Sequence, residues 1–582
     1  MIEDGTRAAV ERWIELDGEY GTELQRLLVD DPDQVATLFD GRIAFGTAGL
    51  RANMGPGPRQ MNRLVVRQTT AGLMAWLPSG STVVIGYDAR HHSKRFAADA
   101  ATMVLAGGGR AVLIDRPAPT PVLARAVLDE RAAAGIMITA SHNPATDNGY
   151  KLYVADGIQL VAPADAEIAA AIDRVAADTD NPLRVPTSAD EPPTGADAPL
   201  TDIETVTDLA IDRHRQVAIE ALVGDARDVN VLYTAMHGVG GDHLLSCFAA
   251  AGFAEPAVVA AQFDPDPDFP TAPFPNPEEP GAFDLAIADA TASGDIDLIL
   301  ANDPDADRLA VGIADTSGNW RRLSGDEVGA LLADYVLQNT VLDGADGGSD
   351  NGPADGSDGG GNGGVMVASS IVSSRFIDRL ARSYGADSIR TLTGFKWVAR
   401  PIVERPDDRY AMGYEEALGY CIGDRVRDKD GISAALVMAE LAAVSKAAGQ
   451  SLQQRLDGLA EAHGLHLTSQ VTVSIADLDD DGQAAVKRRA VGLAPDAVGG
   501  VAVTGREDLS EGRTLPPTSG VMLDLADGSR IIVRPSGTEP KIKAYLEVIE
   551  DAITPGNVEE ARRNAELRLK NLADATAALL QG

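Results

Sequence analysis

The stretch GIMITASHNP, residues 135–144, joins an apolar run to a turn that contains a serine, a histidine and a proline. The first half is typical of a buried strand, and Ser, Asn and Pro commonly follow a strand where the chain turns. On this segment alone, Ser141 is more simply explained as a turn residue than as a nucleophile. The choice between these two roles depends on the rest of the chain.

The same strand-then-loop pattern recurs along the chain. Apolar strand-like runs at 81–89, 111–115, 229–234 and 297–302 alternate with Ala-rich helical stretches. This rhythm predicts βαβ units around mostly parallel sheets, with functional groups on the loops at the strand ends. We therefore expect an α/β fold.

The length of 582 residues is too great for one hydrophobic core, and about 150 residues per domain suggests about four domains. A Pro- and Asp-rich stretch at 178–200 suits a hinge, SGDEVGALLADYVL at 324–337 opens like a capped helix, and strand-like LTSQVTVSI follows residue 465. We expect a final α+β domain after three α/β domains. The expected boundaries are 1–205, 206–323, 324–465 and 466–582.

One segment fits none of these domains. Residues 343–364 are almost entirely Gly, Asp, Ser and Asn, and they cannot bury enough apolar surface to offset the entropy lost on ordering. We predict a disordered surface insertion in the third domain. Its aspartates match no calcium-ligand spacing.

The net charge is -37, from 50 Lys and Arg against 87 Asp and Glu, which argues against nucleic acid or an anionic membrane as a partner. An anionic small-molecule substrate would need a local reversal of this field. Only nine of the basic residues are lysines, and five of these lie in or beside the motifs described below: Lys94, Lys151, Lys396, Lys541 and Lys543.

No apolar run approaches the roughly 18 residues needed to cross a bilayer, and the acidic first residues lack a signal-peptide core. We therefore expect a cytoplasmic protein. Cys247 and Cys421 belong to no ligand-spaced cluster, so neither a disulfide framework nor a zinc site is expected.

The segment LILANDPDADRLAVG, 298–312, has the clearest chemical pattern. Asp303, Asp305 and Asp307 alternate, so in an extended segment their carboxylates would point to one side and could share a hard cation such as Mg²⁺. An EF-hand calcium loop does not fit, because Arg308 stands where that loop needs glycine. Three carboxylates beside an apolar strand would also repel one another without a counter-ion.

Two further loops carry polar groups. IIVRPSGTEPKIKAY, 531–545, gathers a guanidinium, hydroxyls and exposed backbone N–H groups at a glycine turn, which suits a phosphate cradle as well as an ordinary hairpin. AMGYEEALGYCIGD, 411–424, places Glu415 and Glu416 in a glycine-framed loop. These carboxylates could accept hydrogen bonds from sugar hydroxyls, and a surface pair or a helix N-terminus is the plainer alternative.

Together and in this order, these segments resemble the α-D-phosphohexomutase family of phosphoglucomutases, phosphomannomutases and their phosphopentomutase-like relatives. The resemblance runs from GTAGLR at 46 to RPSGTEPKIKAY near 534 and leaves out the insertion. It implies four domains, three related α/β domains and a smaller phosphate-binding α+β domain. It also implies a reaction between a sugar 1-phosphate and its 6-phosphate through a phosphoserine enzyme, with a sugar bisphosphate as activator.

The resemblance also assigns roles to residues. It makes Ser141 the phosphoryl carrier, and Mg²⁺ would be held by that phosphoserine with the three aspartates. Catalytic and charge-handling roles fall to Arg51, His142 and Lys151, with either His142 or Lys151 moving the proton. The implied substrate-binding residues are Arg308, Lys396, Glu415, Arg534, Ser536, Gly537 and Thr538.

Two departures from the family pattern affect the choice of sugar and the metal loop. Many hexomutases carry a serine two residues after the sugar-contact glutamate, where this chain has Ala417. The missing hydroxyl is compatible with glucose, mannose or a pentose phosphate, so phosphopentomutase activity stays an alternative to hexose activity. The metal loop also reads DPDAD where many relatives have glycines.

Overall fold

The computed structural model describes residues 4–46, 49–177, 183, 203–315, 317–346, 364–536 and 540–581. By its internal contacts the chain forms two compact units. Unit 1 comprises Met1–Leu222, Val229–Gly312 and Arg425–Val437, and unit 2 comprises Val223–Asp228, Ile313–Asp424 and Met438–Gly582. Most of the insertion, 347–363, and nearly all of the stretch 178–200 lie outside the described residues.

The first sheet of unit 1 has the strand order β1-β5-β4-β2-β3-β6. Its central strand β2 runs parallel to β3 and β4, whereas β5 runs antiparallel to β4 and β1. The parallel core confirms the predicted βαβ rhythm, which did not indicate the antiparallel edge. The strands are β1 (Leu50–Asn53), β2 (Thr82–Tyr87), β3 (Arg110–Leu113), β4 (Ala134–Ile138), β5 (Asp147–Val154) and β6 (Glu204–Thr205).

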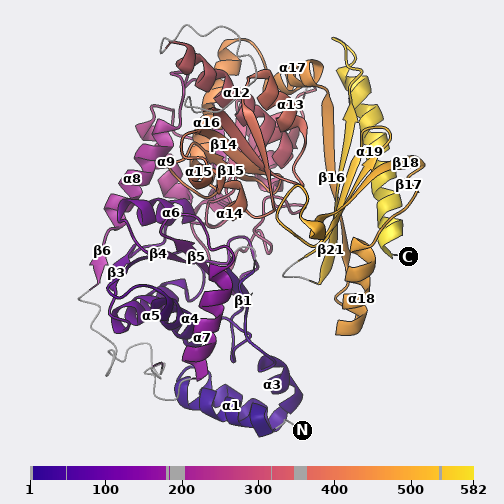
Figure 1. The fold of residues 1–582 in the computed structure, drawn as a ribbon. Coiled ribbons are helices and arrows are strands. Elements are labelled where there is room, and N and C mark those ends of the chain that lie inside the picture. The colour runs from indigo at the N-terminus through magenta and orange to yellow at the C-terminus, as the bar shows by residue number, and fades with distance from the viewer. Residues whose placement is uncertain are drawn as a thin grey trace. The chain divides into compact units, whose positions relative to one another are not determined.

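Helices cover both faces of this sheet (Figure 1). On one face, α4, α5 and α7 form a core with apolar side chains such as Val83 and Ile136, and on the other α6 packs on Val84 and Met137. Neighbouring residues of a strand are therefore buried on opposite faces of the sheet, which explains why the strands are continuous apolar runs in the sequence. The helices are α4 (Arg63–Trp76), α5 (Ser93–Ala106), α6 (Thr120–Asp129) and α7 (Ala164–Ala177), and α1 (Asp4–Leu16), α2 (Gly21–Asp30) and α3 (Pro32–Leu38) precede them.

The second sheet has the order β11-β10-β9-β7-β8, with β7 parallel to β8 and β9, and β10 antiparallel to β9. The turn between β9 and β10 carries the three aspartates. The strands are β7 (Val231–Thr234), β8 (Ala257–Val258), β9 (Leu298–Ala301), β10 (Ala310–Ala314) and β11 (Trp320–Arg322). The helices of this region are α8 (Thr207–Glu220), α9 (Gly241–Ala250), α10 (Ala260–Phe263) and α11 (Asp284–Ser293).

Unit 2 contains a third sheet, of order β13-β12-β14-β15, in which β12 is parallel to both neighbours and β15 closes an antiparallel hairpin with β14. The helix predicted at 324 is confirmed, with Ser324 and Glu327 in a reciprocal capping box. The strands are β12 (Val365–Ser370), β13 (Asp387–Thr391), β14 (Arg409–Glu415) and β15 (Gly419–Ile422). The helices are α12 (Gly325–Asp346), α13 (Phe376–Ser383), α14 (Phe395–Val398), α15 (Pro401–Glu404) and α17 (Leu452–His463), and α16 (Gly431–Ala447) begins in unit 1 and continues into unit 2 after Val437.

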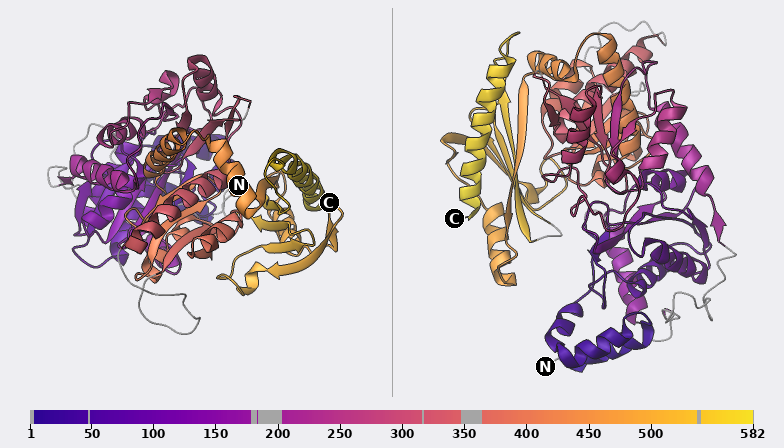
Figure 2. Two further views of the ribbon diagram at one scale, coloured as in Figure 1. Left: turned by 90° about the horizontal axis from the view of Figure 1, so that it is seen from above. Right: turned by 180° about the vertical axis from the view of Figure 1, so that it is seen from behind.

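The C-terminal part of unit 2 is an antiparallel sheet of order β16-β21-β20-β19-β18-β17, which confirms the predicted α+β region. The long helix α19 lies along this sheet, as both views in Figure 2 show, and buries Ala565 and Leu572 with the strands. The elements are β16 (Leu465–Ser474), α18 (Asp480–Val491), β17 (Ala497–Val498), β18 (Val501–Asp508), β19 (Val521–Leu525), β20 (Arg530–Pro535), β21 (Lys541–Glu550) and α19 (Val558–Gln581), with a short 3₁₀ turn η2 (Leu509–Glu511).

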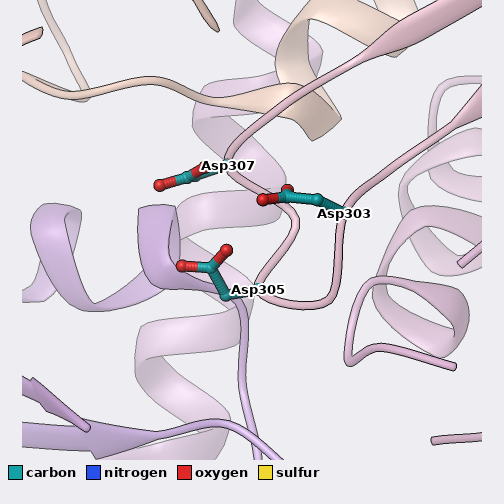
Figure 3. A group of neighbouring side chains, drawn as sticks. All are labelled: Asp303, Asp305 and Asp307. Atoms are coloured by element: carbon teal, nitrogen blue, oxygen red, sulfur yellow. The ribbon is translucent and has the colours of Figure 1, made fainter. Parts of the chain in front are cut away.

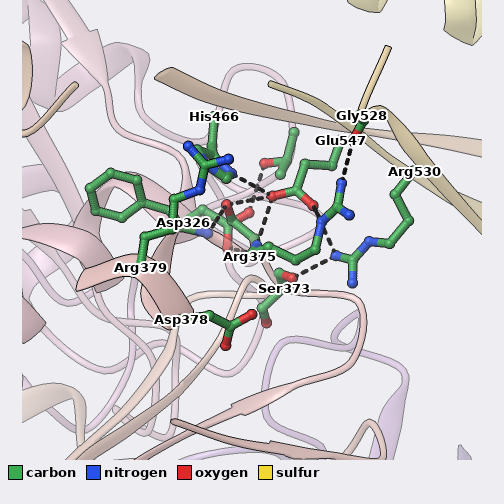
Figure 4. A network of polar contacts seen from close by, with 12 residues as sticks. Asp326, Ser373, Arg375, Asp378, Arg379, His466, Gly528, Arg530 and Glu547 are labelled. Carbon is green, nitrogen blue, oxygen red and sulfur yellow. Dashed lines mark hydrogen bonds and ion pairs between the residues drawn. The ribbon is translucent and has the colours of Figure 1, made fainter. Parts of the chain in front are cut away.

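A buried carboxylate joins this sheet to the loop that follows β12 (Figure 4). Glu547 on β21 accepts hydrogen bonds from Ser374 Oγ (2.8 Å) and from His466 Nδ1 (2.9 Å), and it pairs with Arg375 Nε (2.7 Å) and with Arg530 (3.2 Å). Burial alone would raise the pKa of Glu547, but the His466 hydrogen bond and the neighbouring arginines lower it well below its usual range. The junction therefore depends on a charged, fully paired group.

Cys247 and Cys421 are both buried and form no disulfide with each other. Among the described helices, none is by itself long and apolar enough to cross a membrane, although the bent pair α16 and α17 reaches that length and composition together.

Candidate functional site

Ser141 occupies the turn that directly follows β4 in unit 1. Its backbone is left-handed (φ 53°), and its amide donates to Thr139 Oγ1 at 2.8 Å. The hydroxyl donates to Asp303 Oδ2 at 2.9 Å and lies 3.1 Å from His142 Nδ1. Left-handed backbone at a non-glycine residue is strained and is found mainly at functional sites. Ser141 is buried, with 1% of the residue exposed.

The side chain of Arg90 stabilises this turn through hydrogen bonds. The buried guanidinium donates to the carbonyl oxygens of Ser141 (2.6 Å), Pro144 (2.7 Å) and Asn143, and it pairs with Asp88 at 3.4 Å. One side chain therefore satisfies several carbonyl groups that the turn leaves without strand partners. The sequence motif gave no indication of this support.

The aspartate loop 303–307 is a tight turn and not the extended segment that the alternating carboxylates suggested. Ala306 is left-handed (φ 54°), and its amide donates to Asp303 O at 2.8 Å. The loop is supported from α6, because Thr120 donates from its amide (2.9 Å) and its hydroxyl (2.6 Å) to Asp305. The carboxylates do converge as predicted, but a turn brings them together.

The three carboxylates point into a common space (Figure 3), and one oxygen from each can be chosen so that all lie within 4.8 Å of one another. Asp305 Oδ1 and Asp307 Oδ1 are buried with no hydrogen-bond partner. Buried carboxylate oxygens without partners are costly, and a small divalent cation with oxygen ligands would satisfy them. The donor set therefore fits Mg²⁺.

The other oxygens of these aspartates are held by cationic side chains. Lys151 Nζ bridges Asp305 Oδ2 (2.6 Å) and Asp307 Oδ2 (2.7 Å), and Lys429 Nζ lies 3.0 Å from the same oxygen of Asp307. Burial raises the pKa of Asp307, but Lys151 and Lys429 outweigh it and lower the pKa far below its usual value. Burial and the two other carboxylates raise the pKa of Asp303 to about 8.

Three more predicted residues lie beside this loop. Arg308 donates from its amide to Asp303 Oδ1 (3.0 Å) and from its guanidinium to Glu278 (3.1 Å). Arg51 on β1 reaches Asn143 Oδ1 at 3.4 Å. Burial, then the charges of Arg308 and Arg51, lower the pKa of His142 well below its usual value, so its imidazole is neutral at pH 7.

The remaining predicted residues belong to unit 2. Glu415, the last residue of β14, accepts a hydrogen bond from Gly394 N at 2.6 Å, which places it beside the TGFKWV segment that contains Lys396. Arg534 at the end of β20 donates to Thr393 Oγ1 of that segment, and Ser536 N donates to Lys541 O at 2.9 Å. Gly537 and Thr538 lie outside the described residues.

Glu416, which the sequence offered with Glu415 as a possible acceptor for sugar hydroxyls, faces the loop after β12. Its Oε2 accepts hydrogen bonds from Ser373 Oγ (2.9 Å) and Ser370 Oγ (3.0 Å). Burial, then the neighbouring charge of Glu415, raise the pKa of Glu416 to about 7. The two adjacent glutamates thus have different environments, and neither is part of a helix.

Sequence reasoning missed Lys429, Thr120 and Arg90. Lys429 stands in RVRDKDGIS, 425–433, where a lysine between two aspartates is a weak signal in an acidic chain. The rarity of lysine in this chain could have indicated Lys429, because most of the few lysines lie in or beside the other motifs.

Comparison with known proteins identifies the family of the chain. The four models of the phosphoglucomutase/phosphomannomutase family match in order: alpha/beta/alpha domains I, II and III at residues 42–178, 212–317 and 324–462, and the C-terminal domain at 483–562. They match more than half of the chain, and the predicted architecture of three α/β domains with a smaller C-terminal domain is confirmed.

Individual relatives are similar over nearly their whole length. The chain is 40% identical to a Haemophilus influenzae protein named "Probable phosphomannomutase", over 84% of this chain and 93% of that protein. It is 34% identical to the phosphopentomutase of Homo sapiens, over 94% and 90%. The fold matches that of parafusin, a phosphoglucomutase from Paramecium, with a TM-score of 0.65 and 18% identity over 92% of this chain and 95% of that one.

The order of the four matched domains, the near-complete coverage of these relatives and the serine beside an acidic loop lead to one conclusion. The chain belongs to the phosphoglucomutase/phosphomannomutase family and is a phosphosugar mutase, an isomerase.

Proposed function

We propose that this mutase interconverts the 1-phosphate and the 6-phosphate of a hexose, glucose or mannose, through a phosphoryl group carried on Ser141. The observation that best supports this proposal is the position of Ser141 Oγ, which lies 2.9 Å from Asp303 Oδ2. The Oδ1 atoms of Asp305 and Asp307 in the same loop have no hydrogen-bond partner. A nucleophilic oxygen next to a hard-cation site is the arrangement that phosphoryl transfer requires.

Asp303, Asp305 and Asp307 would hold Mg²⁺ together with the phosphorylated Ser141. When bound, the ion neutralises charge that develops on the phosphoryl oxygens. Lys151, held at 2.6 and 2.7 Å from two of these aspartates, keeps a positive charge beside the same oxygens, and Arg308 adds another. These positive charges offset part of the negative charge of the protein at the site.

The reaction passes one phosphoryl group out and another back. The phosphoryl group leaves Ser141 Oγ for the free hydroxyl of a sugar monophosphate, which gives a sugar bisphosphate and an unmodified serine. The bisphosphate then returns its other phosphoryl group to Ser141, so a free bisphosphate would serve as activator of unphosphorylated enzyme. His142, with its neutral ring 3.1 Å from Ser141 Oγ, can accept the proton of the Ser141 hydroxyl when that oxygen takes up a phosphoryl group. Lys151 is the other candidate for moving a proton in the reaction.

The unit 2 residues would recognise the rest of the substrate. Glu415 supplies a carboxylate for sugar hydroxyls, with Lys396 on the adjoining segment. Arg534, Ser536, Gly537 and Thr538 would take the phosphate that is not reacting. Burial lowers the pKa of the Arg534 guanidinium, which would remain charged at neutral pH.

Phosphopentomutase activity is the second candidate. The relative named phosphopentomutase matches 94% of this chain at 34% identity, and Ala417 offers no hydroxyl where many hexomutases have serine. A site that lacks a polar contact discriminates weakly between substrates that differ by one hydroxymethyl group.

Measurement of kcat/KM for glucose, mannose and ribose 1-phosphates, each with its matching bisphosphate, tests the proposal. We expect turnover of glucose 1-phosphate, with mannose and ribose 1-phosphates also accepted. A preference for ribose above about a hundredfold, worth about 2.7 kcal/mol of discrimination, would contradict the hexose assignment. Ala417→Ser should shift the ratio toward hexoses, and an unmoved ratio would place the selectivity elsewhere.

A further inference from the structure

A short segment after β15, residues 428–431 with the sequence DKDG, contributes to unit 1 although the surrounding chain belongs to unit 2. Each of its four residues contacts unit 1. We call it the DKDG segment. Three of its residues fix its position, and the fourth, Lys429, reaches the aspartate loop.

Asp428 and Asp430 anchor the segment through buried hydrogen bonds. The carboxylate of Asp428 accepts from Tyr153 OH and Gln159 Nε2, both at 2.6 Å. Asp430 accepts from His214 Nε2 at 3.0 Å. Both carboxylates are 1% exposed, so these bonds fix the backbone on either side of Lys429.

Gly431 brings the segment against the aspartate loop itself. A Cβ added there would lie 2.2 Å from Arg308 O and 2.5 Å from Asn302 Nδ2, distances that real side chains do not tolerate. The backbone therefore approaches the loop more closely than any other residue type would allow.

Lys429 is delivered by these anchors to the metal-binding carboxylates. Its side chain is only 12% exposed, and its Nζ lies 3.0 Å from Asp307 Oδ2 and 3.3 Å from Asp428 Oδ1. Together with Lys151 and Arg308, it sets three cationic side chains against the three aspartates of the loop.

We propose that Lys429 is a built-in counter-cation of the aspartate loop, which balances the charge of Asp307 in competition with a bound divalent ion. This inference rests on the proposed Mg²⁺ site. Lys429 and a divalent ion compensate the same buried negative charge. Bound Mg²⁺ should therefore reduce the stabilisation that Lys429 provides, and Lys429 should lower the affinity for Mg²⁺.

The test uses full-length, unphosphorylated protein stripped of divalent ions. Lys429→Met removes the charge and keeps an unbranched side chain of similar length. We expect Mg²⁺ to bind the variant at least about tenfold more tightly by calorimetry at fixed ionic strength, equivalent to about 1.4 kcal/mol. We also expect the metal-free Tm to fall by about 5 °C or more and saturating Mg²⁺ to restore most of the loss.

Two variants serve as controls. Lys429→Arg keeps the charge and should resemble wild type in both measurements. Lys446→Met makes the same change at a lysine that pairs with exposed Asp228 at 3.7 Å, and it should change neither value. Lys429→Met with unchanged or weaker Mg²⁺ binding would overturn the proposal.

A thermal double-mutant cycle keeps the test decisive if Lys429→Met is poorly folded without metal. In an Asp307→Asn background, Lys429→Met should lower the Tm much less than in wild type, because the charge that it balances is gone. Equal losses in both backgrounds would overturn the proposal. Wild-type Mg²⁺ binding that survives Asp305→Asn would instead contradict the metal site itself, and the cycle would still decide whether Lys429 balances Asp307.

Discussion

Glu416 illustrates how one buried residue can make the stability of this protein depend on pH. Its carboxylate is held by Ser370 and Ser373, and the charged groups that face it are Glu415, Asp326 and Arg534. Because burial and Glu415 raise its pKa to about 7 in the folded state, folding binds a proton that the unfolded chain releases near pH 4.5. Stability therefore falls as pH rises from about 4.5 to about 7.

Glu416→Gln should remove this loss. We expect the variant to gain stability relative to wild type across that pH window, by up to about 3 kcal/mol above pH 7. Urea unfolding at pH 5, 6, 7 and 8 measures the difference. Glu404→Gln, at an exposed glutamate, serves as the control and should show no such trend. A Glu416→Gln difference that stays constant with pH would show that Glu416 is ionised throughout.

Side-chain chemistry, more than backbone geometry, could be predicted from the sequence at this scale. Asp303, Asp305 and Asp307 were correctly grouped, but by assuming an extended segment where the chain makes a turn with left-handed Ala306. The spacing of the three aspartates is compatible with both an extended segment and a turn, because either conformation can bring their carboxylates together. Lys429 could not be placed because it reaches the loop from over a hundred residues away, through anchors that only the folded chain brings together.

The helix α12 and the sugar-contact hairpin are in unusually close contact. A Cβ added at Gly325, the first residue of α12, would lie 1.8 Å from the carbonyl oxygen of Glu416. No methyl group can occupy that position unless the backbone of the turn between β14 and β15 moves.

Gly325→Ala should therefore displace the turn that carries Glu415. We expect destabilisation by about 1–3 kcal/mol and a larger rise in KM than fall in kcat, since Ser141 lies in the other unit. Steady-state kinetics with urea unfolding measure both. Gly458→Ala in α17 is the matched control, because nothing lies within 4 Å of the added Cβ, and it should be neutral or stabilising by up to about 1 kcal/mol. Unchanged stability and kinetics in Gly325→Ala would contradict this contact.

The sequence predicted the positions of the strands better than whether each strand runs parallel or antiparallel to its neighbours. The runs at 81–89 and 297–302 became β2 and β9, because continuous apolar sequence suits strands covered on both faces. The antiparallel partners β5 and β10 follow their neighbours through short turns whose hairpin geometry leaves no periodic signal. The domain boundaries expected from composition remain predictions.

At the scale of the whole chain, the Glu547 cluster fastens the C-terminal sheet to the loop after β12 within unit 2 (Figure 4). Removing one member of a buried charged network leaves the others unpaired, and this costs more than the net value of the network. The sheet that carries Arg534 should therefore depend on Glu547 for its attachment.

Glu547→Gln should destabilise the protein by about 3–5 kcal/mol at pH 7. Because its folded pKa is lowered, the stabilisation by Glu547 is present above the ordinary glutamate value and is lost as pH falls below it, so the cost of the substitution should shrink in acid. Urea unfolding at pH 7 and pH 4 gives the two values. Glu560→Gln, on the exposed side of α19, should be neutral at both. A neutral Glu547→Gln would mean that apolar contacts alone hold the junction.

The central claim is that Ser141 carries the phosphoryl group, and peptide mass spectrometry tests it most directly. After incubation with glucose 1,6-bisphosphate and Mg²⁺, we predict one phosphoryl group on the peptide that contains Ser141, and its loss on addition of excess glucose 1-phosphate. Ser141→Ala should remain unmodified, stay folded and lose turnover by on the order of a thousandfold or more. Near-normal turnover in Ser141→Ala, or a wild-type enzyme that turns over with Ser141 never phosphorylated, would contradict the account.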